Sequence, residues 1–114
     1  MLSEPDFSGE PDAQSYAKLI GACGNSRRLA DAEAVFGQMK AHRIRPDDFV
    51  YRELIKAAGR RKDAERAWEL FDEMLDEYLI VPDVRTYAAL IFASASTGDA
   101  TRAFEAYDLL LAEG

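Results

Sequence analysis

The chain has 114 residues, of which 48% are hydrophobic and 31% charged, and its formal net charge is −7. This length suits about one small domain, and the composition supports a packed core rather than a disordered chain. No run of ~18 consecutive apolar residues is present, so we expect no membrane-spanning helix. Residues 1–12 are acidic and resemble neither a signal peptide nor an Arg-rich transit sequence, so we expect an irregular leader there.

The side chains available for catalysis or metal binding are few. Cys23 is the only cysteine and His42 the only histidine, which excludes an internal disulfide and a Cys/His zinc cluster. Cys23 lies among apolar residues of a predicted helix, so we expect a buried structural thiol. His42 has no nucleophile or carboxylate beside it in the sequence and is expected on the surface. The sequence therefore predicts a protein that is not an enzyme and holds no cofactor or metal.

Internal repetition is the strongest signal in the sequence. The dipeptide Pro-Asp recurs at 11–12, 46–47 and 82–83, with spacings of 35 and 36 residues. A Tyr-x-x-Leu-Ile string follows each one, at 16–20, 51–55 and 87–91. An Ala-x-x-x-Phe-x-x-Met string recurs later, at 32–39, 67–74 and, with Tyr and Leu as its last two members, at 103–110. This many coincidences at one period indicate three tandem units.

Each unit is predicted to contain two amphipathic helices. In the second unit the apolar residues from Tyr51 to Ala58 follow i, i+3, i+4, i+7 spacing. Pro46 prevents the preceding helix from continuing, and Asp47 or Asp48 can cap the new one. The same reasoning predicts helices near residues 13–23, 29–42, 48–59, 64–77, 84–96 and 100–112.

Breaks between the paired helices are predicted from glycine and aspartate. Gly24, Gly59 and Gly98 are expected to weaken or end the first helix of each unit, while Asp63 and Asp99 cap the second. Two-helix units stack side by side and bury their apolar stripes against one another. We therefore predict an all-α, right-handed helical-repeat solenoid (an α-α superhelix) of three helix–turn–helix units, at 13–47, 48–83 and 84–114. The aligned Tyr, Leu, Ile, Phe and Met positions are predicted to form its core.

The period and the two recurring strings, together with the closing Pro-Asp, resemble the pentatricopeptide repeat over residues 11–114. The tetratricopeptide repeat fits less well, because it has Leu-Gly where this chain has Leu-Ile in every unit. The second unit departs from the pattern by one extra residue, and Leu110 stands where Met is usual. The resemblance implies an organellar location, in a mitochondrion or plastid, although no targeting sequence is visible in the chain.

The resemblance also implies RNA recognition, with one base read per repeat by two or three side chains. The base-reading pairs would be Ala17 with Asp47 and Arg52 with Asp83, and Ala88 has no closing partner in the sequence. The family prefers Asn, Ser or Thr after the Tyr, because these side chains hydrogen-bond a base edge. Since Ala17 and Ala88 cannot do so, the resemblance implies little base selectivity.

The residues that would sandwich the bases are implied by the same resemblance. They are Gln14, Phe49 and Arg85, of which only Phe49 offers a plane for stacking. RNA binding, if present, is therefore expected to be weak, salt-sensitive and unselective.

Charge is segregated between the two helices of the second unit. Arg52, Lys56 and Arg60 recur every four residues on the first helix and form one basic stripe. The second helix is strongly acidic, and like charges four residues apart repel, so a basic protein partner is one expectation for it. Its candidate contact residues are Glu69, Glu73 and Asp76. The resemblance places the basic stripe on the concave side and the acidic helix outside.

Two functions remain open from the sequence. The leading hypothesis is a non-catalytic helical-repeat scaffold that contacts other protein subunits of a larger organellar assembly, because three units would read only about three nucleotides and two of the three reader positions after the Tyr are Ala. The overall charge also opposes binding to phosphates. The alternative is an organellar RNA-binding repeat protein, or a fragment of one, that acts in RNA processing or translation. For the scaffold, Leu109 and Leu111 are further candidate contacts, since nothing later in the sequence covers them.

Overall fold

The computed structural model describes residues 12–26 and 28–113, and these contain six α-helices and no strand. The helices are α1 (Ala13–Asn25), α2 (Leu29–Ala41), α3 (Asp48–Arg60), α4 (Ala64–Asp76), α5 (Val84–Ser96) and α6 (Ala100–Glu113). All six start where the sequence predicted, and their ends differ from the prediction by no more than two residues. The expected irregular leader lies outside the described residues except for Asp12.

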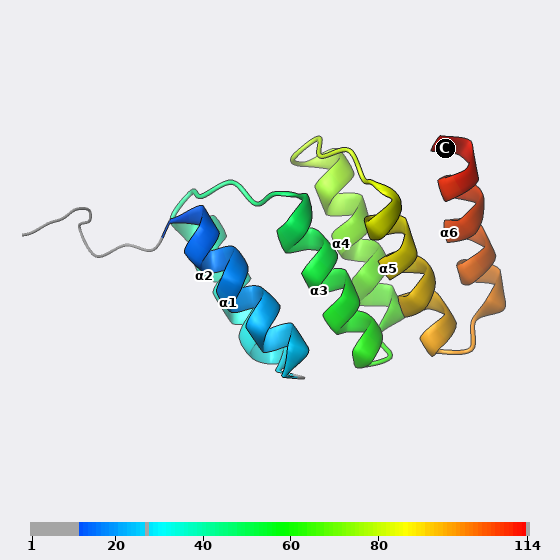
Figure 1. The fold of residues 1–114 in the computed structure, drawn as a ribbon, viewed down its shortest axis with the longest axis horizontal. Coiled ribbons are helices and arrows are strands. Elements are labelled where there is room, and N and C mark those ends of the chain that lie inside the picture. The colour runs from blue at the N-terminus through cyan, green and yellow to red at the C-terminus, as the bar shows by residue number, and fades with distance from the viewer. Residues whose placement is uncertain (1–11, 27, 114) are drawn as a thin grey trace, which may run out of the picture.

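The helices form three hairpins stacked side by side. Each hairpin pairs consecutive helices, α1 with α2, α3 with α4 and α5 with α6, and α3 packs against both α1 and α5. Figure 1 shows α1, α3 and α5 as one row, with α2 and α4 behind it. The predicted all-α repeat solenoid is therefore confirmed, and the first helices of all three units share one side of the stack.

Aspartate residues in equivalent positions start the first helix of each unit. Asp12, Asp47 and Asp83 accept hydrogen bonds from backbone N–H groups three residues later, at 2.9, 3.0 and 3.0 Å. Each bond satisfies a donor that the first helical turn leaves unpaired. The N–H of Thr86 lowers the pKa of Asp83, because the bond favours the charged carboxylate.

The predicted core is present except at the two ends of the stack. The repeated tyrosines Tyr16, Tyr51 and Tyr87 are buried, as are the first two phenylalanine positions, Phe36 and Phe71. Their rings meet across the boundaries between units: Phe36 lies 5.4 Å from Tyr51 and Phe71 5.8 Å from Tyr87, centroid to centroid. These contacts tie each hairpin to the next.

Two residues assigned to the core are instead about half exposed, Leu19 and Tyr107. Leu19 aligns with Leu54, which is fully buried, and Tyr107 aligns with Phe71, which is buried and packs on Tyr87 of the following hairpin. No described helix precedes α1 or follows α6, so nothing covers these two side chains. The two residues occupy the repeat positions that the sequence predicted, but whether such a position is buried depends on a neighbouring hairpin that covers it.

The glycines predicted at the breaks lie at or next to the ends of the first helices. Gly98 follows α5 with a φ of +78°, which suits glycine, and it separates α5 from α6 as expected. Gly24 and Gly59 are the last residues but one of α1 and α3, and each helix ends one residue later. A Cβ at Gly59 would come within 2.9 Å of the Phe92 ring and 3.0 Å of Ala93 Cα, so this glycine permits a close approach of α3 and α5.

Cys23 and His42 also have defined surroundings. Cys23 packs against the core but is only partly buried, so the prediction of a fully buried thiol was wrong in degree. It lies on α1, which no described hairpin covers on its outer side. His42 is exposed, as predicted, and its Nδ1 lies 3.4 Å from the Tyr16 hydroxyl.

Candidate nucleic-acid interface

The basic stripe of α3 lines a cleft against α5. Arg52, Lys56 and Arg60 follow one another at one-turn intervals, and Arg85 of α5 joins them. The cleft has a volume of about 480 Å³, and Ala88, Ala89 and Phe92 complete its lining. Four cations thus border one hollow, on the side of the stack formed by the first helices.

Local contacts hold three of these cations in place. The Arg52 guanidinium carbon lies 5.3 Å from the Phe49 ring centroid, a cation–π distance. Lys56 Nζ lies 3.4 Å from Oε2 of Glu53, and Arg60 Nη1 donates to the carbonyl oxygen of Gly24 at 3.0 Å. The buried Glu53 was not singled out from the sequence, and it offsets part of the charge of Lys56.

The base-reading positions implied by the resemblance are only partly accessible. Ala17 is buried, while Ala88 is exposed and lines the cleft. Asp47 and Asp83 are exposed at the helix starts, but one oxygen of each is engaged in capping. Arg52 is the one reader position with a hydrogen-bond donor in the cleft. The described residues thus offer few polar groups for telling one base from another.

The sandwiching positions differ from expectation in one respect. Gln14 and Arg85 are exposed. Phe49 is partly buried, because Arg52 covers part of its ring and its Cζ lies close to Gly21 of α1. The stacking plane predicted at Phe49 is therefore already partly occupied by the protein itself.

A more accessible aromatic ring, which had not been predicted from the sequence, lies on α5. Phe92 of α5 is 50% exposed and lines the cleft. It follows Arg85 by seven residues and Ala88 by four, so it lies on the same helix face. It also aligns with Lys56 of the basic stripe, which was the signal that could have found it.

Part of the acidic side of α4 is engaged in contacts with α2. Arg66 donates from Nε and Nη2 to the two carboxylate oxygens of Glu33, at 2.7 and 2.6 Å, and pairs with Glu69 at 3.1 Å. The bonds to Glu33 raise the pKa of Arg66. Glu33 and Glu69 therefore both pair with Arg66 of the same chain.

The other two acidic candidates differ from each other. Glu73 accepts bonds from Lys40 Nζ at 3.2 Å and from the Tyr51 hydroxyl at 2.5 Å, so it joins the first and second units. Asp76 is exposed. The pKa of Asp72 is raised mainly by the burial of Asp72 itself and, to a smaller extent, by the charge of Asp76. Only part of the predicted acidic surface is thus available to a partner.

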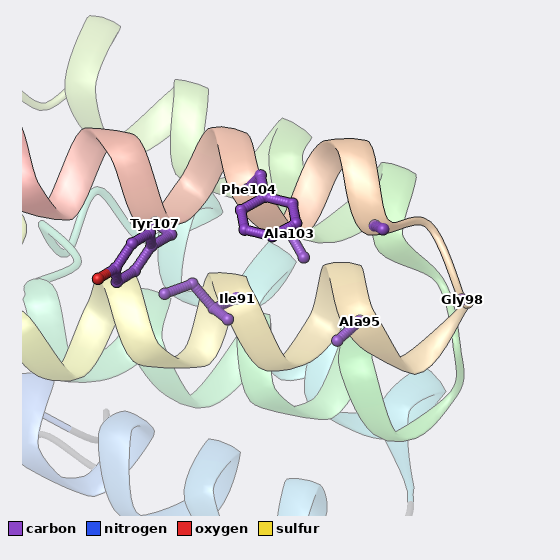
Figure 2. A pocket seen from close by; sticks show the side chains of 7 residues that line it. Ile91, Ala95, Gly98, Ala103, Phe104 and Tyr107 are labelled. Atoms are coloured by element: carbon purple, nitrogen blue, oxygen red, sulfur yellow. The ribbon is translucent and has the colours of Figure 1, made fainter.

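The last hairpin ends in an apolar pocket of about 440 Å³. Figure 2 shows its lining from α5, including Ile91 and Ala95, and from α6, including Ala103, Phe104 and Tyr107. We call this surface, with the neighbouring exposed Leu111, the end face. It is an accessible apolar surface at this end of the stack.

The predicted contact residues Leu109 and Leu111 do not share one face of α6. Residues two apart on a helix are separated by about 200° around its axis. Leu109 lines a different hollow with Leu75 and Tyr87, whereas Leu111 is exposed and follows Phe104 by seven residues, which places both on one face of α6. The sequence located an apolar end but not which side chains form it.

The equivalent surface of the second unit packs against α5 inside the stack. Trp68, which aligns with Phe104, donates from Nε1 to Ser94 Oγ of α5 at 3.0 Å. Phe71, which aligns with Tyr107, packs on Tyr87. The end face therefore repeats a surface that this chain already uses to bind a following hairpin.

None of the six helices is long and apolar enough to cross a bilayer. Among residues 12–26 and 28–113, no three His, Cys, Asp or Glu side chains are grouped to hold a metal ion.

Similar solved structures share this fold. The pentatricopeptide repeat protein PPR10 in complex with an 18-nt psaJ RNA element matches 97% of this chain and 16% of its own, with 24% identity and a TM-score of 0.84. The PPR domain of Arabidopsis thaliana protein-only RNase P 1, in complex with tRNA, matches 90% of this chain and 53% of its own, with 24% identity and a TM-score of 0.74. At this identity both matches concern the fold.

Sequence comparisons agree. A chloroplastic pentatricopeptide repeat-containing protein of Arabidopsis thaliana is 38% identical over 61 residues, which are 53% of this chain and 9% of that protein. Another pentatricopeptide repeat-containing protein of Arabidopsis thaliana, whose name gives no location, is 26% identical over 69 residues, which are 60% of this chain and 12% of that protein. The chain thus spans about a tenth of the length of these relatives. The family model described as the pentacotripeptide-repeat region of PRORP matches residues 12–114. The chain therefore belongs to the pentatricopeptide repeat family.

Proposed function

We propose that this chain is a non-catalytic, RNA-binding stack of pentatricopeptide repeats that holds single-stranded RNA in the cleft between α3 and α5. The observation that carries the proposal is the convergence of Arg52, Lys56, Arg60 and Arg85 on one cleft. Cations along a groove neutralise phosphates, and this supplies most of the affinity for single strands. The RNA complexes of the two similar structures support the same choice.

The protein scaffold, which the sequence put first, has less support. Glu73 bonds to Tyr51 and Lys40, and Glu69 to Arg66, so two of its three acidic contact residues already have partners inside the fold. The net charge of −7, which argued against RNA, is an average over the chain. What an RNA meets is the local charge of the cleft.

The binding we propose is weak and tolerant of sequence. Ala88 offers a methyl group to a base, Ala17 is buried, and three units can read only about three nucleotides. We further propose that the protein acts in RNA processing or translation in a plastid or mitochondrion. The chloroplastic name of one relative supports the location.

Fluorescence anisotropy with short labelled RNAs of several sequences, across a range of salt concentrations, tests this function. Four phosphate contacts on a single strand predict a slope of log K against log salt of about −3. Similar affinities for the different sequences are also expected. No binding at low salt would contradict RNA binding, and tight binding of one sequence alone would contradict the lack of selectivity.

A second proposal concerns the end face. We infer that it packs against the first helix of another repeat hairpin with the same pattern as α3 and α5, because Trp68 and Phe71 use the equivalent surface in this way. The energy of a repeat stack is approximately a sum over units and their interfaces, so an added hairpin should stabilise it.

Joining a copy of residues 79–113 after residue 114 tests this proposal. We expect a higher melting temperature than that of the original chain, and Tyr107→Lys in the extended protein should remove the gain. Tyr107→Lys in the original chain is the control, and it should change the melting temperature little because this side chain is half exposed. An extended protein that melts at the original temperature would rule the proposal out.

A further inference from the structure

Phe92 occupies an unusual position for a large apolar side chain. It lies on α5 in the row of first helices, half exposed, on the face that carries Arg85 and Ala88. Its Cδ2 and Cε2 atoms lie where a Cβ at Gly59 would be only 2.9 Å away. One edge of the ring is thus seated against bare helix backbone, while half of the side chain stays open to solvent.

The ring borders two hollows at once. On one side is the cleft with its four cations. On the other is a second hollow of about 630 Å³, which contains Arg60, Lys62 and the polar residues Asn25 and Ser96. Arg60 lines both hollows, so cationic groups are present on both sides of one exposed aromatic ring.

This arrangement matches the chemistry of single-stranded nucleic acid. Such ligands alternate phosphates, which need cations, with bases, whose faces stack on aromatic rings irrespective of sequence. The ring also lies one turn beyond Ala88, the position that has no polar group for a base edge. Phe104, which is exposed but lies on the end face among apolar residues, lacks any comparable set of cations.

We propose that Phe92 is the base-stacking residue of a nucleotide subsite, with the phosphates on either side of the stacked base held by the cations of the cleft and by Arg60 and Lys62. The inference rests on the proposed RNA binding and adds to it the group that holds the base. It moves the stacking role from Phe49, whose ring is partly covered, to a ring at a different position in the unit.

The test compares Phe92→Ala, Phe92→Leu and Phe92→Tyr with Phe104→Ala as the matched control. Each protein is titrated with labelled oligouridine and with an abasic oligonucleotide of the same length and charge. Loss of one stacked base predicts roughly 5- to 150-fold weaker binding of oligouridine by the Ala and Leu variants. The Tyr variant and the Phe104 control should bind like the original protein.

Two further readouts separate stacking from charge. The abasic oligonucleotide should bind equally to the original protein and to Phe92→Ala, and the salt slope should be the same for both. In Phe92→Trp, oligouridine should quench the added tryptophan emission, after subtraction of the signal of Trp68 in the original protein.

Two results would overturn the inference in different ways. Salt-dependent binding of the original protein with no loss in the Ala and Leu variants would reject Phe92 and leave the RNA cleft standing. Absence of any RNA binding by the original protein at low salt would reject both. Circular dichroism of each variant checks that a loss of binding does not come from unfolding.

Discussion

The hydroxyl group of the fully buried Tyr51 donates a hydrogen bond of 2.5 Å to Oε2 of Glu73, and the same oxygen lies 3.2 Å from Lys40 Nζ. Tyr51 belongs to α3, Glu73 to α4 and Lys40 to α2 of the preceding unit. A single carboxylate therefore joins the two helices of one hairpin to the hairpin before it. The ring of Tyr51 packs edge-on against Phe36 at the same boundary.

Tyr51→Ala should lower the free energy of unfolding far more than Arg52→Ala, although the two residues are adjacent. Removing a large buried aromatic typically costs about 3–5 kcal/mol, and here the partners of Glu73 are reduced as well. Arg52 is only partly buried, and its loss removes one cation–π contact of about 0.5–1 kcal/mol. Urea denaturation of both variants measures the difference. Equal midpoints would mean that the phase of α3 is wrong.

Above about pH 10, the free energy of unfolding of the original protein should fall more steeply with rising pH than that of the Tyr51→Phe variant. Burial, together with the bond to Glu73, raises the pKa of Tyr51 far above its ordinary value of about 10. The unfolded chain therefore releases this proton at a lower pH than the folded chain does. The raised pKa of Tyr51 therefore contributes to the free energy of unfolding in full below pH ~10. Above that pH this contribution falls by up to about 1.4 kcal/mol per pH unit.

Urea denaturation at several pH values between 8 and 11 measures this effect. Tyr51→Phe should be less stable than the original protein at pH 8, because Glu73 loses a donor, but the difference should shrink as the pH rises. Parallel pH profiles of the two proteins would show that the phenol is not protected from ionisation.

The contact between Arg66 and Glu33 should contribute measurably to the docking of the first two units. Both side chains are less than one-third exposed, at 29% and 28%, and the Arg66 guanidinium binds the Glu33 carboxylate in a bidentate manner. A double-mutant cycle with Arg66→Ala and Glu33→Ala should give a coupling of about 1 kcal/mol. The exposed pair Arg28 and Asp31 is the matched control, with a coupling expected below about 0.5 kcal/mol. Equal couplings for the two pairs would contradict this account of the interface.

Local signals in the sequence were sufficient for the helices and most of the core. Each Pro-Asp supplies a cap that acts over three residues, and the spacing of Tyr51 with Leu54 fixes the buried face of its helix. Both are short-range properties of the chain, so they could be predicted before any packing was known. The exposure of Leu19 and Tyr107 depends instead on which hairpin lies beside them.

The site was harder to predict, because its features arise where different helices meet. Phe92 becomes a candidate only once Gly59 of α3 and the cations of the cleft are seen around it. In the same way, the charge of Lys56 is partly neutralised by its ion pair with Glu53, which is buried where α1 packs against α3. A list of charged residues along the chain contains neither relationship.

Charge neutralisation confined to the cleft tests the RNA proposal most directly. The double variant Arg52→Gln/Arg85→Gln is compared with Arg28→Gln/Arg43→Gln, which has the same net charge but changes exposed residues outside the cleft. Fluorescence anisotropy with labelled oligouridine at several salt concentrations gives the affinity and the salt slope of each protein. We expect the cleft variant to bind more weakly, with a slope smaller in magnitude by about 1.4, while the control variant keeps the original slope. Equal slopes for the two variants would contradict binding of RNA in the cleft between α3 and α5.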